Sequence, residues 1–206
     1  VDHVWDAIDA GADIIVAQGG EAGGHGMQRG VMSFVPEAAD LIAAQSPETL
    51  LVAAGGIADG RGLAAALMLG AEGVLVGTRF WASQEALVHE RHHAAILEAT
   101  GDDTVRTSVV DIARQIAWPR GFSARVRHNA FTRRWHGHEP ELQQAVATEA
   151  PAYRQAFAEG DPEQTGVWFG EAAGLINAIE PAGVLVERMA AEAAALLKAG
   201  GRQAKA

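Results

Sequence analysis

A glycine-rich loop that contains one histidine is the stretch of this sequence best suited to chemistry. Residues 18–26 read Gln-Gly-Gly-Glu-Ala-Gly-Gly-His-Gly and follow an apolar run at residues 14–17, which predicts a buried strand. Glycines let the backbone take positive φ angles and approach a planar ligand closely, and an imidazole exchanges protons near neutral pH. The loop predicts a ligand site with His25 as a base beside it, whereas the same motif alone would indicate a solvent-exposed histidine on a glycine turn.

The loop holds a second ionisable group, Glu21, which lies before the second pair of glycines. A carboxylate at this position competes with His25 for the catalytic role. It can instead fix the loop by accepting hydrogen bonds from backbone amides. We therefore assign the catalytic role to His25.

Two further glycine turns each follow an apolar run. Gly55 and Gly56 end the first run, and Gly77 and Thr78 end the second. Each turn leads toward a predicted helix whose N-terminal amides can receive a phosphate, and Thr78 adds a hydroxyl donor. Successive loops of this kind after the last strands form the phosphate site of many (β/α)8 enzymes. The two turns therefore predict a phosphate site near the histidine loop.

Alternating helices and strands must position these loops. Helices are predicted at the start of the chain, over residues 38–44, and from a capping Asp59 to Leu69. Buried strands are predicted over residues 14–17, 50–54 and 74–76. Successive αβ units build a parallel sheet, and strands that are apolar throughout are expected to be buried on both faces. Periodicity alone does not distinguish a barrel from a doubly wound sheet.

Beyond residue 83 the pattern is mostly helical. The helices are predicted over residues 87–99, 140–159 and 183–199. The segment from Asp111 to Trp135 is rich in arginine and aromatic residues without a clear period, so we expect an irregular cap or lid there and assign it no catalytic role. The expected division is a barrel part at 1–83, a helical lid at 84–180 and a C-terminal helix at 181–206 that packs back on the barrel, with a frayed tail from Gly200 to Ala206.

Composition and charge exclude several classes of function. The net charge of -10 and the pI near 5.2 argue against nucleic acid, because phosphate binding needs a basic face. The chain has no cysteine, which excludes disulfides, thiolate nucleophiles and thiolate metal sites. No run reaches the roughly 18 apolar residues of a membrane span, and the N-terminus lacks a signal-peptide pattern. We expect a cytoplasmic protein that binds neither nucleic acid nor membranes.

The sequence His-Glu-Arg-His-His at residues 89–93 formally matches the zinc-protease pattern H-E-x-x-H. A third ligand is not evident, and the neighbouring apolar residues indicate an ordinary surface helix. We therefore predict no metal site, and we expect these histidines, together with His136 and His138, to face water.

Four segments within the first 80 residues resemble the nitronate monooxygenase (2-nitropropane dioxygenase) family in order and spacing. They are Gly-Ala-Asp-Ile-Ile-Val-Ala-Gln at 11–18, Glu-Ala-Gly-Gly-His at 21–25, Ala-Ala-Gly-Gly-Ile-Ala-Asp-Gly at 53–60 and Gly-Val-Leu-Val-Gly-Thr-Arg-Phe at 73–80. A weaker likeness extends to residues 125–129 and 170–176. The combination is specific, whereas no single piece is.

The resemblance implies an α/β fold, the C-terminal portion of an FMN-dependent (β/α)8 TIM barrel with the last three of eight strands in this chain. Since the sequence opens inside a helical pattern, we expect a segment before Val1, and unpaired strand edges would favour self-association, for example as a homodimer. By matching positions, Gln18 and Gly23 would contact the isoalloxazine side of FMN, with Gly24 in the same loop. The residues that would hold the ribityl phosphate are Gly55, Gly56, Leu75, Val76, Gly77 and Thr78.

The implied activity is the oxidation of alkyl nitronates or nitroalkanes with O2 to carbonyl compounds and nitrite. His25 would lie near the reactive edge of the flavin and take the α-proton of a nitroalkane or position a nitronate. The nearest alternative is an FMN-dependent enoyl-acyl-carrier-protein reductase, which shares the barrel and a very similar histidine loop but draws hydride from NAD(P)H. A third alternative is a non-catalytic flavin- or phosphate-binding remnant without the N-terminal half.

Overall fold

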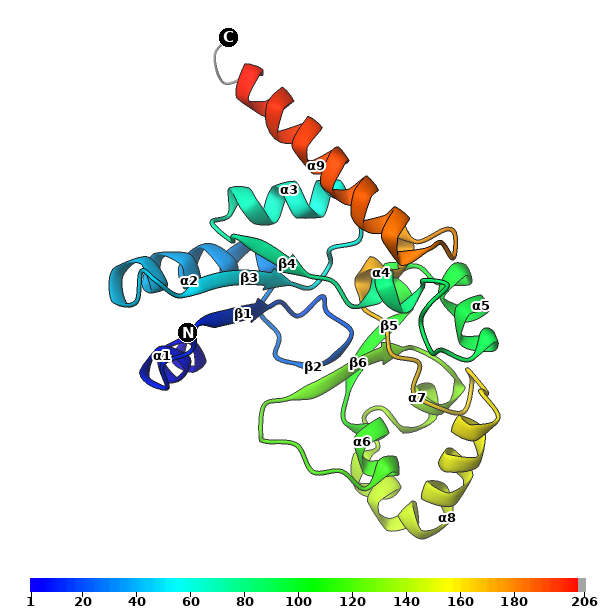
Figure 1. Ribbon diagram of the computed structural model, residues 1–206. Coiled ribbons are helices and arrows are strands. Elements are labelled where there is room, and N and C mark those ends of the chain that lie inside the picture. Colours follow the sequence, from blue (N-terminus) through cyan, green and yellow to red (C-terminus); the bar gives the residue numbers. More distant parts are fainter. Residues whose placement is uncertain (204–206) are drawn as a thin grey trace.

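The computed structural model describes residues 1–203, which form two small sheets with helices packed against them (Figure 1). The strands are β1 (Ile14–Gln18), β2 (Gly24–Gly26), β3 (Leu50–Ala54), β4 (Gly73–Leu75), β5 (Thr104–Thr107) and β6 (Ser123–Arg127). The helices are α1 (Asp2–Asp9), α2 (Val31–Gln45), α3 (Gly60–Met68), α4 (Thr78–Trp81), α5 (Glu90–Glu98), α6 (Val109–Arg114), α7 (Ala130–Trp135), α8 (Glu139–Ala158) and α9 (Ala182–Gln203), with the 3₁₀ turns η1 (Gly101–Asp103) and η2 (Glu171–Leu175).

The first sheet is parallel, in the order β1-β3-β4, as the three αβ units predict. Strand β3 covers the predicted residues, and β4 begins one residue earlier than predicted, at Gly73. In the register of the sheet, Gln18 pairs with Ala54 and Ala54 pairs with Leu75. The ends of the three strands therefore meet at one edge, where the glycine loops begin.

One face of this sheet packs on helices and the other does not. Ile15, Ala17, Leu51 and Ala53 point into a core that also contains Val35 and Ile42 of α2. On the opposite face the exposed fractions are 56% for Ile14, 42% for Val16, 46% for Leu50 and 51% for Leu75. The expectation of strands buried on both faces is therefore wrong for the described residues, because three strands do not close a barrel and nothing in this part of the chain covers the second face.

The second sheet is antiparallel, in the order β2-β6-β5, and it corrects the expectation of an irregular segment from Asp111 to Trp135. That segment contains most of α6, all of β6 and the whole of α7. Along β6 buried Ala124 and Val126 alternate with half-buried arginines, which is the period of a strand with one face in a core. Strand β2 is the last part of the histidine loop and pairs with β6. It thereby joins two lobes of the molecule, one built on the parallel sheet and the other on the antiparallel sheet (Figure 1).

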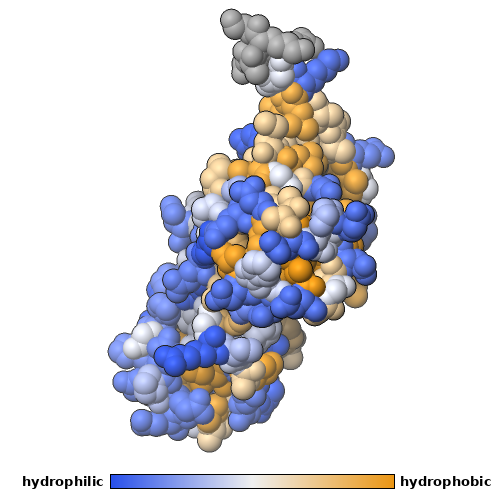
Figure 2. All heavy atoms as spheres, turned by 90° about the vertical axis from the view of Figure 1, so that its left-hand side faces the viewer, coloured by the Kyte–Doolittle hydropathy of each residue, from blue (hydrophilic) through white to orange (hydrophobic). Residues whose placement is uncertain are grey.

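The helices predicted beyond residue 83 are confirmed as α5, α8 and α9. Helix α9 packs on α3 and then extends away from the body, and apolar side chains gather along its projecting part (Figures 1 and 2). It continues through Gln203, beyond the expected fraying point at Gly200, while residues 204–206 of the expected tail lie outside the described residues. None of the helices in the described part of the chain combines the length and apolarity that crossing a membrane requires.

Of the histidines expected to face water, His89, His136 and His138 are exposed, whereas His92 and His93 of α5 differ from the expectation. Only 7% of the His92 surface is exposed, and its ring lies 6.3 Å from that of Trp81. His89 caps the helix by accepting a hydrogen bond from the amide of Arg91, and His93 Nε2 lies 3.1 Å from the carbonyl oxygen of Trp81. His92 and His93 therefore pack α5 against Trp81, while His89 caps the helix from the surface.

Candidate functional site

A cavity of about 200 Å³ lies at the edge where the three parallel strands end. Its lining includes eight of the nine cofactor residues that the resemblance implies, namely Gln18, Gly23, Gly24, Gly55, Gly56, Leu75, Gly77 and Thr78. The ninth, Val76, packs against the core of the parallel sheet instead. The three glycine turns therefore converge on one cavity.

Two of the glycines have backbone conformations that side chains disfavour. Gly55 has a φ of +109° and Gly56 a φ of +69°. A Cβ atom on Gly55 would lie 3.1 Å from the carbonyl oxygen of Gly19. Within the described residues, the amides of Gly55, Gly56 and Gly77 have no hydrogen-bond acceptor, so they remain available to a ligand.

The N-terminus of α3, which the sequence suggested as a phosphate site, is already satisfied. Asp59 accepts hydrogen bonds from the amides of Arg61 at 2.9 Å and Gly62 at 3.3 Å. The amide of Gly60 donates to Glu192 of α9 at 3.1 Å. The anion-binding capacity therefore lies in the turns themselves, before α3 begins, and this part of the expectation is wrong.

The hydroxyl of Thr78 has a structural partner. Its oxygen accepts a hydrogen bond of 3.0 Å from the amide of Gly170, in the segment that leads into η2. A hydroxyl also carries a proton that it can donate. Thr78 can therefore anchor the segment around Gly170 and still contribute a donor to the cavity.

His25 lies on β2 and lines a second cavity, of about 330 Å³, that adjoins the first. The walls of this second cavity are His25, Arg114, Ile116, Trp118 and Trp168. Trp168 also lines the glycine cavity, so the two cavities share this residue. The position of His25 is fixed from β1, because Gln18 Nε2 donates a hydrogen bond of 2.6 Å to the His25 carbonyl oxygen.

The imidazole of His25 is held by a carboxylate and an indole ring. His25 Nε2 lies 2.9 Å and 2.8 Å from the two carboxylate oxygens of Asp111, whose surface is 5% exposed. The ring of Trp118 stacks on the imidazole with a centroid distance of 3.7 Å. Both residues come from the segment to which the sequence assigned no role. The one local signal for Asp111 is a single carboxylate within the apolar run Val-Val-Asp-Ile-Ala at residues 109–113.

Two arginines hold the glycine loop: Arg106, which the sequence did not single out, and Arg125, which begins the weaker likeness at residues 125–129. Arg106 of β5 donates to the carbonyl oxygens of Gly20 at 3.0 Å and Gly26 at 2.9 Å. Arg125 of β6 donates to Gly20 at 2.8 Å. Burial lowers the pKa of the Arg106 guanidinium from its ordinary value, and the charge of Arg125 acts in the same direction. Loop carbonyls thus serve as hydrogen-bond acceptors for two half-buried cations.

Glu21 has the structural role that the sequence offered as its alternative. Its carboxylate oxygens accept hydrogen bonds of 2.9 Å and 3.2 Å from the amide of Val31. Val31 is the first residue of α2, where an acceptor satisfies an amide that the helix itself leaves unpaired. Glu21 therefore fixes the loop to α2, whereas His25 faces a cavity.

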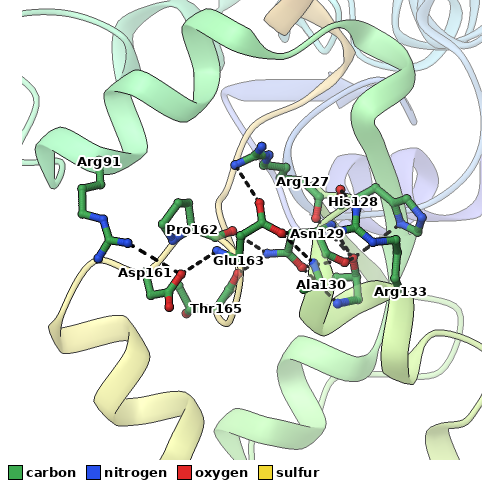
Figure 3. Close-up of polar contacts among 11 residues, drawn as sticks. Arg91, Arg127, His128, Asn129, Ala130, Arg133, Asp161, Pro162, Glu163 and Thr165 are labelled. Carbon is green, nitrogen blue, oxygen red and sulfur yellow. Dashed lines mark hydrogen bonds and ion pairs between the residues drawn. The ribbon is translucent and has the colours of Figure 1, made fainter.

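The segment that carries Trp168 is fixed through a polar cluster around Asn129 and Glu163 (Figure 3). Asn129 is fully buried and donates hydrogen bonds of 2.8 Å to the carbonyl of Pro162 and 2.7 Å to that of Thr165. Glu163 accepts from the amide of Ala130 at 3.0 Å. Because these contacts join the segment to the start of α7, they set the path of the chain toward Trp168.

Comparison with known proteins supports the resemblance seen in the sequence. A family model described as nitronate monooxygenase matches residues 1–192. The nitronate monooxygenase npaC of Metarhizium robertsii is 36% identical, over 96% of this chain and 58% of that protein. A nitronate monooxygenase of Neurospora crassa is 37% identical, over 91% of this chain and 50% of that protein.

Solved structures share the fold over nearly the whole chain. FabK from Thermotoga maritima superimposes with a TM-score of 0.81 at 34% identity, over 96% of this chain and 59% of that one. The nitroalkane oxidase from Streptomyces ansochromogenes gives a TM-score of 0.79 at 28% identity, over 96% of this chain and 56% of that one. The chain therefore spans between 50% and 59% of the length of these four proteins. Because the family model matches most of its residues, the chain belongs to the nitronate monooxygenase family.

Proposed function

We propose that this chain supplies the phosphate-binding turns and the catalytic base of an FMN-dependent nitronate monooxygenase. The enzyme would oxidise alkyl nitronates or nitroalkanes with O2 to carbonyl compounds and nitrite. The observation that carries the proposal is the meeting of two cavities at Trp168, one lined by glycines and the other by His25. The first suits the phosphate end of a flavin, and the second suits an organic substrate.

The glycine cavity fits the phosphate part of FMN. The open amides of Gly55, Gly56 and Gly77 are donors of the kind that phosphate oxygens accept. A cavity of about 200 Å³ is smaller than the roughly 300–1,000 Å³ of pockets that enclose a drug-sized ligand. The isoalloxazine ring of FMN would therefore need contacts from residues outside the described part of the chain. This agrees with the finding that the chain spans only part of the length of its relatives.

When bound, FMN would supply the redox chemistry. The residues of this chain would do the rest: His25 takes the α-proton of a nitroalkane or positions a nitronate, and Trp118 and Trp168 exclude water from the imidazole. In this proposal residues 1–83 form the barrel part and residues 181–206 the closing helix. Residues 84–180 form a lid that contributes Asp111 and both tryptophans.

Two other functions stay open to the same test. An FMN-dependent enoyl-acyl-carrier-protein reductase is one, because the histidine loop of that family is very similar. A non-catalytic flavin- or phosphate-binding protein is the other, because the chain spans only part of its relatives. The three functions differ in what reduces the flavin and in whether FMN binds at all.

The experiment uses the full-length protein, reconstituted with FMN and freed of excess flavin by dialysis. Under anaerobic conditions, we expect ethylnitronate to bleach the flavin absorbance and NADPH to leave it unchanged. With O2 admitted, oxygen uptake should accompany the release of nitrite. Bleaching by NADPH alone would assign the reductase function, and a protein that retains no FMN would be the non-catalytic one.

A further inference from the structure

The contact between His25 and Asp111 joins residues that lie 86 positions apart in the sequence. His25 belongs to the small antiparallel sheet, and Asp111 lies in the first turn of α6. The side-chain exposed fractions are 13% for His25 and 7% for Asp111, so the pair is largely removed from water. A buried carboxylate is costly unless it is paired. Here the partners are His25 Nε2 and, at 3.7 Å, the guanidinium of Arg114.

The hydrogen bond distinguishes the two nitrogens of the imidazole. A carboxylate can only accept hydrogen bonds, and a neutral imidazole has one nitrogen that donates and one that accepts. Since both Asp111 oxygens lie within 2.9 Å of Nε2, the proton belongs on Nε2. Nδ1 has no hydrogen-bond partner among the described residues, and His25 lines the cavity beside Trp118 and Trp168.

We propose that Asp111 is a positioning residue that holds the neutral His25 imidazole in the tautomer protonated at Nε2 and so makes Nδ1 the atom that accepts the proton of the substrate. The identity of the substrate rests on the proposed function, but the tautomer does not. In the step itself the α-C–H bond of a nitroalkane breaks, and a bond forms between that proton and Nδ1. The electron pair of the broken bond stays on the substrate as a nitronate. The Asp111 carboxylate then faces an imidazolium, whose charge it stabilises.

The stacking of Trp118 strengthens this assignment. An interplanar angle of 11° keeps the indole and imidazole nearly parallel. Trp118 therefore restricts the tilt of the imidazole while Asp111 restricts its rotation about the Cβ–Cγ bond. With both contacts in place, one face of the ring and one nitrogen are occupied, which leaves a single basic atom for a ligand in the cavity.

The test reads the tautomer directly, in the full-length protein without FMN. ¹⁵N chemical shifts and two-bond couplings of histidine-labelled protein distinguish the protonated ring nitrogen, and the His25→Asn spectrum identifies the His25 signals. We expect Nε2–H in the wild type and in Asp111→Glu. In Asp111→Asn the side chain offers an N–H donor as well as an oxygen, so the Nε2–H population should fall. Nδ1–H in the wild type, or an unchanged tautomer in Asp111→Asn, would overturn the proposal.

The functional arm compares the same variants on nitroethane and on preformed ethylnitronate. Asp111→Asn should lower turnover of nitroethane by about 10²-fold relative to turnover of ethylnitronate, at the lower end of the effect of general-base help. Asp111→Glu should restore much of that ratio. Asp103→Asn is the matched control, because Asp103 accepts hydrogen bonds at the start of η1 and lines neither cavity. Equal losses of turnover on both substrates in Asp111→Asn would contradict the positioning role. A wild-type protein that is inactive on both substrates would contradict the proposed function, but it would not affect the tautomer measured by NMR.

Discussion

Trp118 stacks on His25 with ring centroids 3.7 Å apart, although 44% of the Trp118 surface remains exposed. Its indole ring serves as a wall for the imidazole and does not line the glycine cavity. A stacked aromatic pair contributes about 0.5–1.5 kcal/mol beyond the burial of its area. Trp118→Leu should therefore lower turnover of nitroethane by about 2-fold to 10-fold. Trp118→Phe keeps a ring at the same place and should lose less, and FMN retention should not change in either variant. A loss of flavin in Trp118→Leu would contradict this placement.

Gly77 offers a direct probe of the ligand cavity. Its φ is -92°, and a Cβ atom there would meet no other atom within 4 Å, so a side chain costs the fold little. Since Gly77 lines the cavity, the side chain in Gly77→Val should intrude on the ligand and weaken FMN binding by about 10-fold or more, equivalent to at least about 1.4 kcal/mol. The dissociation constant is measured by flavin fluorescence and stability by thermal melting.

Gly73→Val is the matched control, because Gly73 also has open space at its Cβ position but does not line the cavity. Gly56→Ala is less informative. At a φ of +69°, alanine would add a left-handed strain of about 1–2 kcal/mol that affects folding as well as binding. Unchanged FMN affinity in Gly77→Val would remove this turn from the phosphate site.

Asn129 should dominate the stability of the lobe that carries Trp168. Its side-chain amide pairs with the carbonyls of Pro162 and Thr165, and its oxygen accepts from the amide of Thr132 at 3.0 Å. A buried polar group without a partner costs about 1–3 kcal/mol. Asn129→Ala should therefore lower the free energy of unfolding by roughly 2–4 kcal/mol, measured by urea denaturation. The side chain of Glu163 is 42% exposed, and glutamine keeps an oxygen that can accept hydrogen bonds. Glu163→Gln should therefore lower the free energy of unfolding by less than about 1 kcal/mol. Similar losses for both variants would contradict this ranking.

The parallel sheet is predictable from sequence because its signals are local. Each strand is a short apolar run that is followed within two residues by a glycine, and β3 covers the residues that the pattern predicts. The antiparallel sheet is less predictable. Strand β2 has three residues, two of them glycine, and it gains its partner β6 only through folding. The arginines of β6 also conceal its alternation, because each is half-buried and has a partner that the sequence does not indicate: Arg125 donates to the carbonyl oxygen of Gly20, and Arg127 pairs with Glu163.

The candidate site likewise has a part that the sequence predicts and a part that it does not. The glycine turns and His25 stand out because each turn follows directly from its strand. Asp111, Trp118 and Trp168 reach His25 from distant parts of the chain, and no local pattern assigns them a partner. The weak signal of Asp111 is its place in an apolar helix, where an isolated carboxylate needs a partner that the sequence does not name.

His92 should make stability depend on pH. Burial lowers the pKa of its imidazole below the ordinary value of 6.5, and the charges of neighbouring His89 and Arg91 act in the same direction. The unfolded chain therefore binds a proton first as the pH falls. The contribution of neutral His92 to the free energy of unfolding is therefore fully present above about pH 6.5, and it is lost as the pH falls through the pKa of His92 in the folded state. Thermal melts between pH 7.5 and 5 should show a flatter pH dependence in His92→Gln. His138→Gln is the control, since 63% of the His138 side chain is exposed. If the melting temperature of His92→Gln changed with pH as steeply as that of the wild type, the assignment to His92 would be wrong.

The replacement of His25 by asparagine separates proton removal from every other role of the site. If His25 is the base, His25→Asn should lose about 10²-fold to 10⁴-fold in turnover of nitroethane, the usual range for loss of general-base help. Ethylnitronate is already deprotonated, so its turnover should fall less. FMN retention should stay normal, because His25 lines the second cavity and the glycine turns are untouched.

Oxygen uptake on the two substrates measures the effect of His25→Asn in the full-length protein. The control is His136→Asn, because His136 belongs to the same lobe and its side chain is 44% exposed. Equal losses on both substrates would replace the base role with a positioning role, and no loss on either would remove His25 from the mechanism.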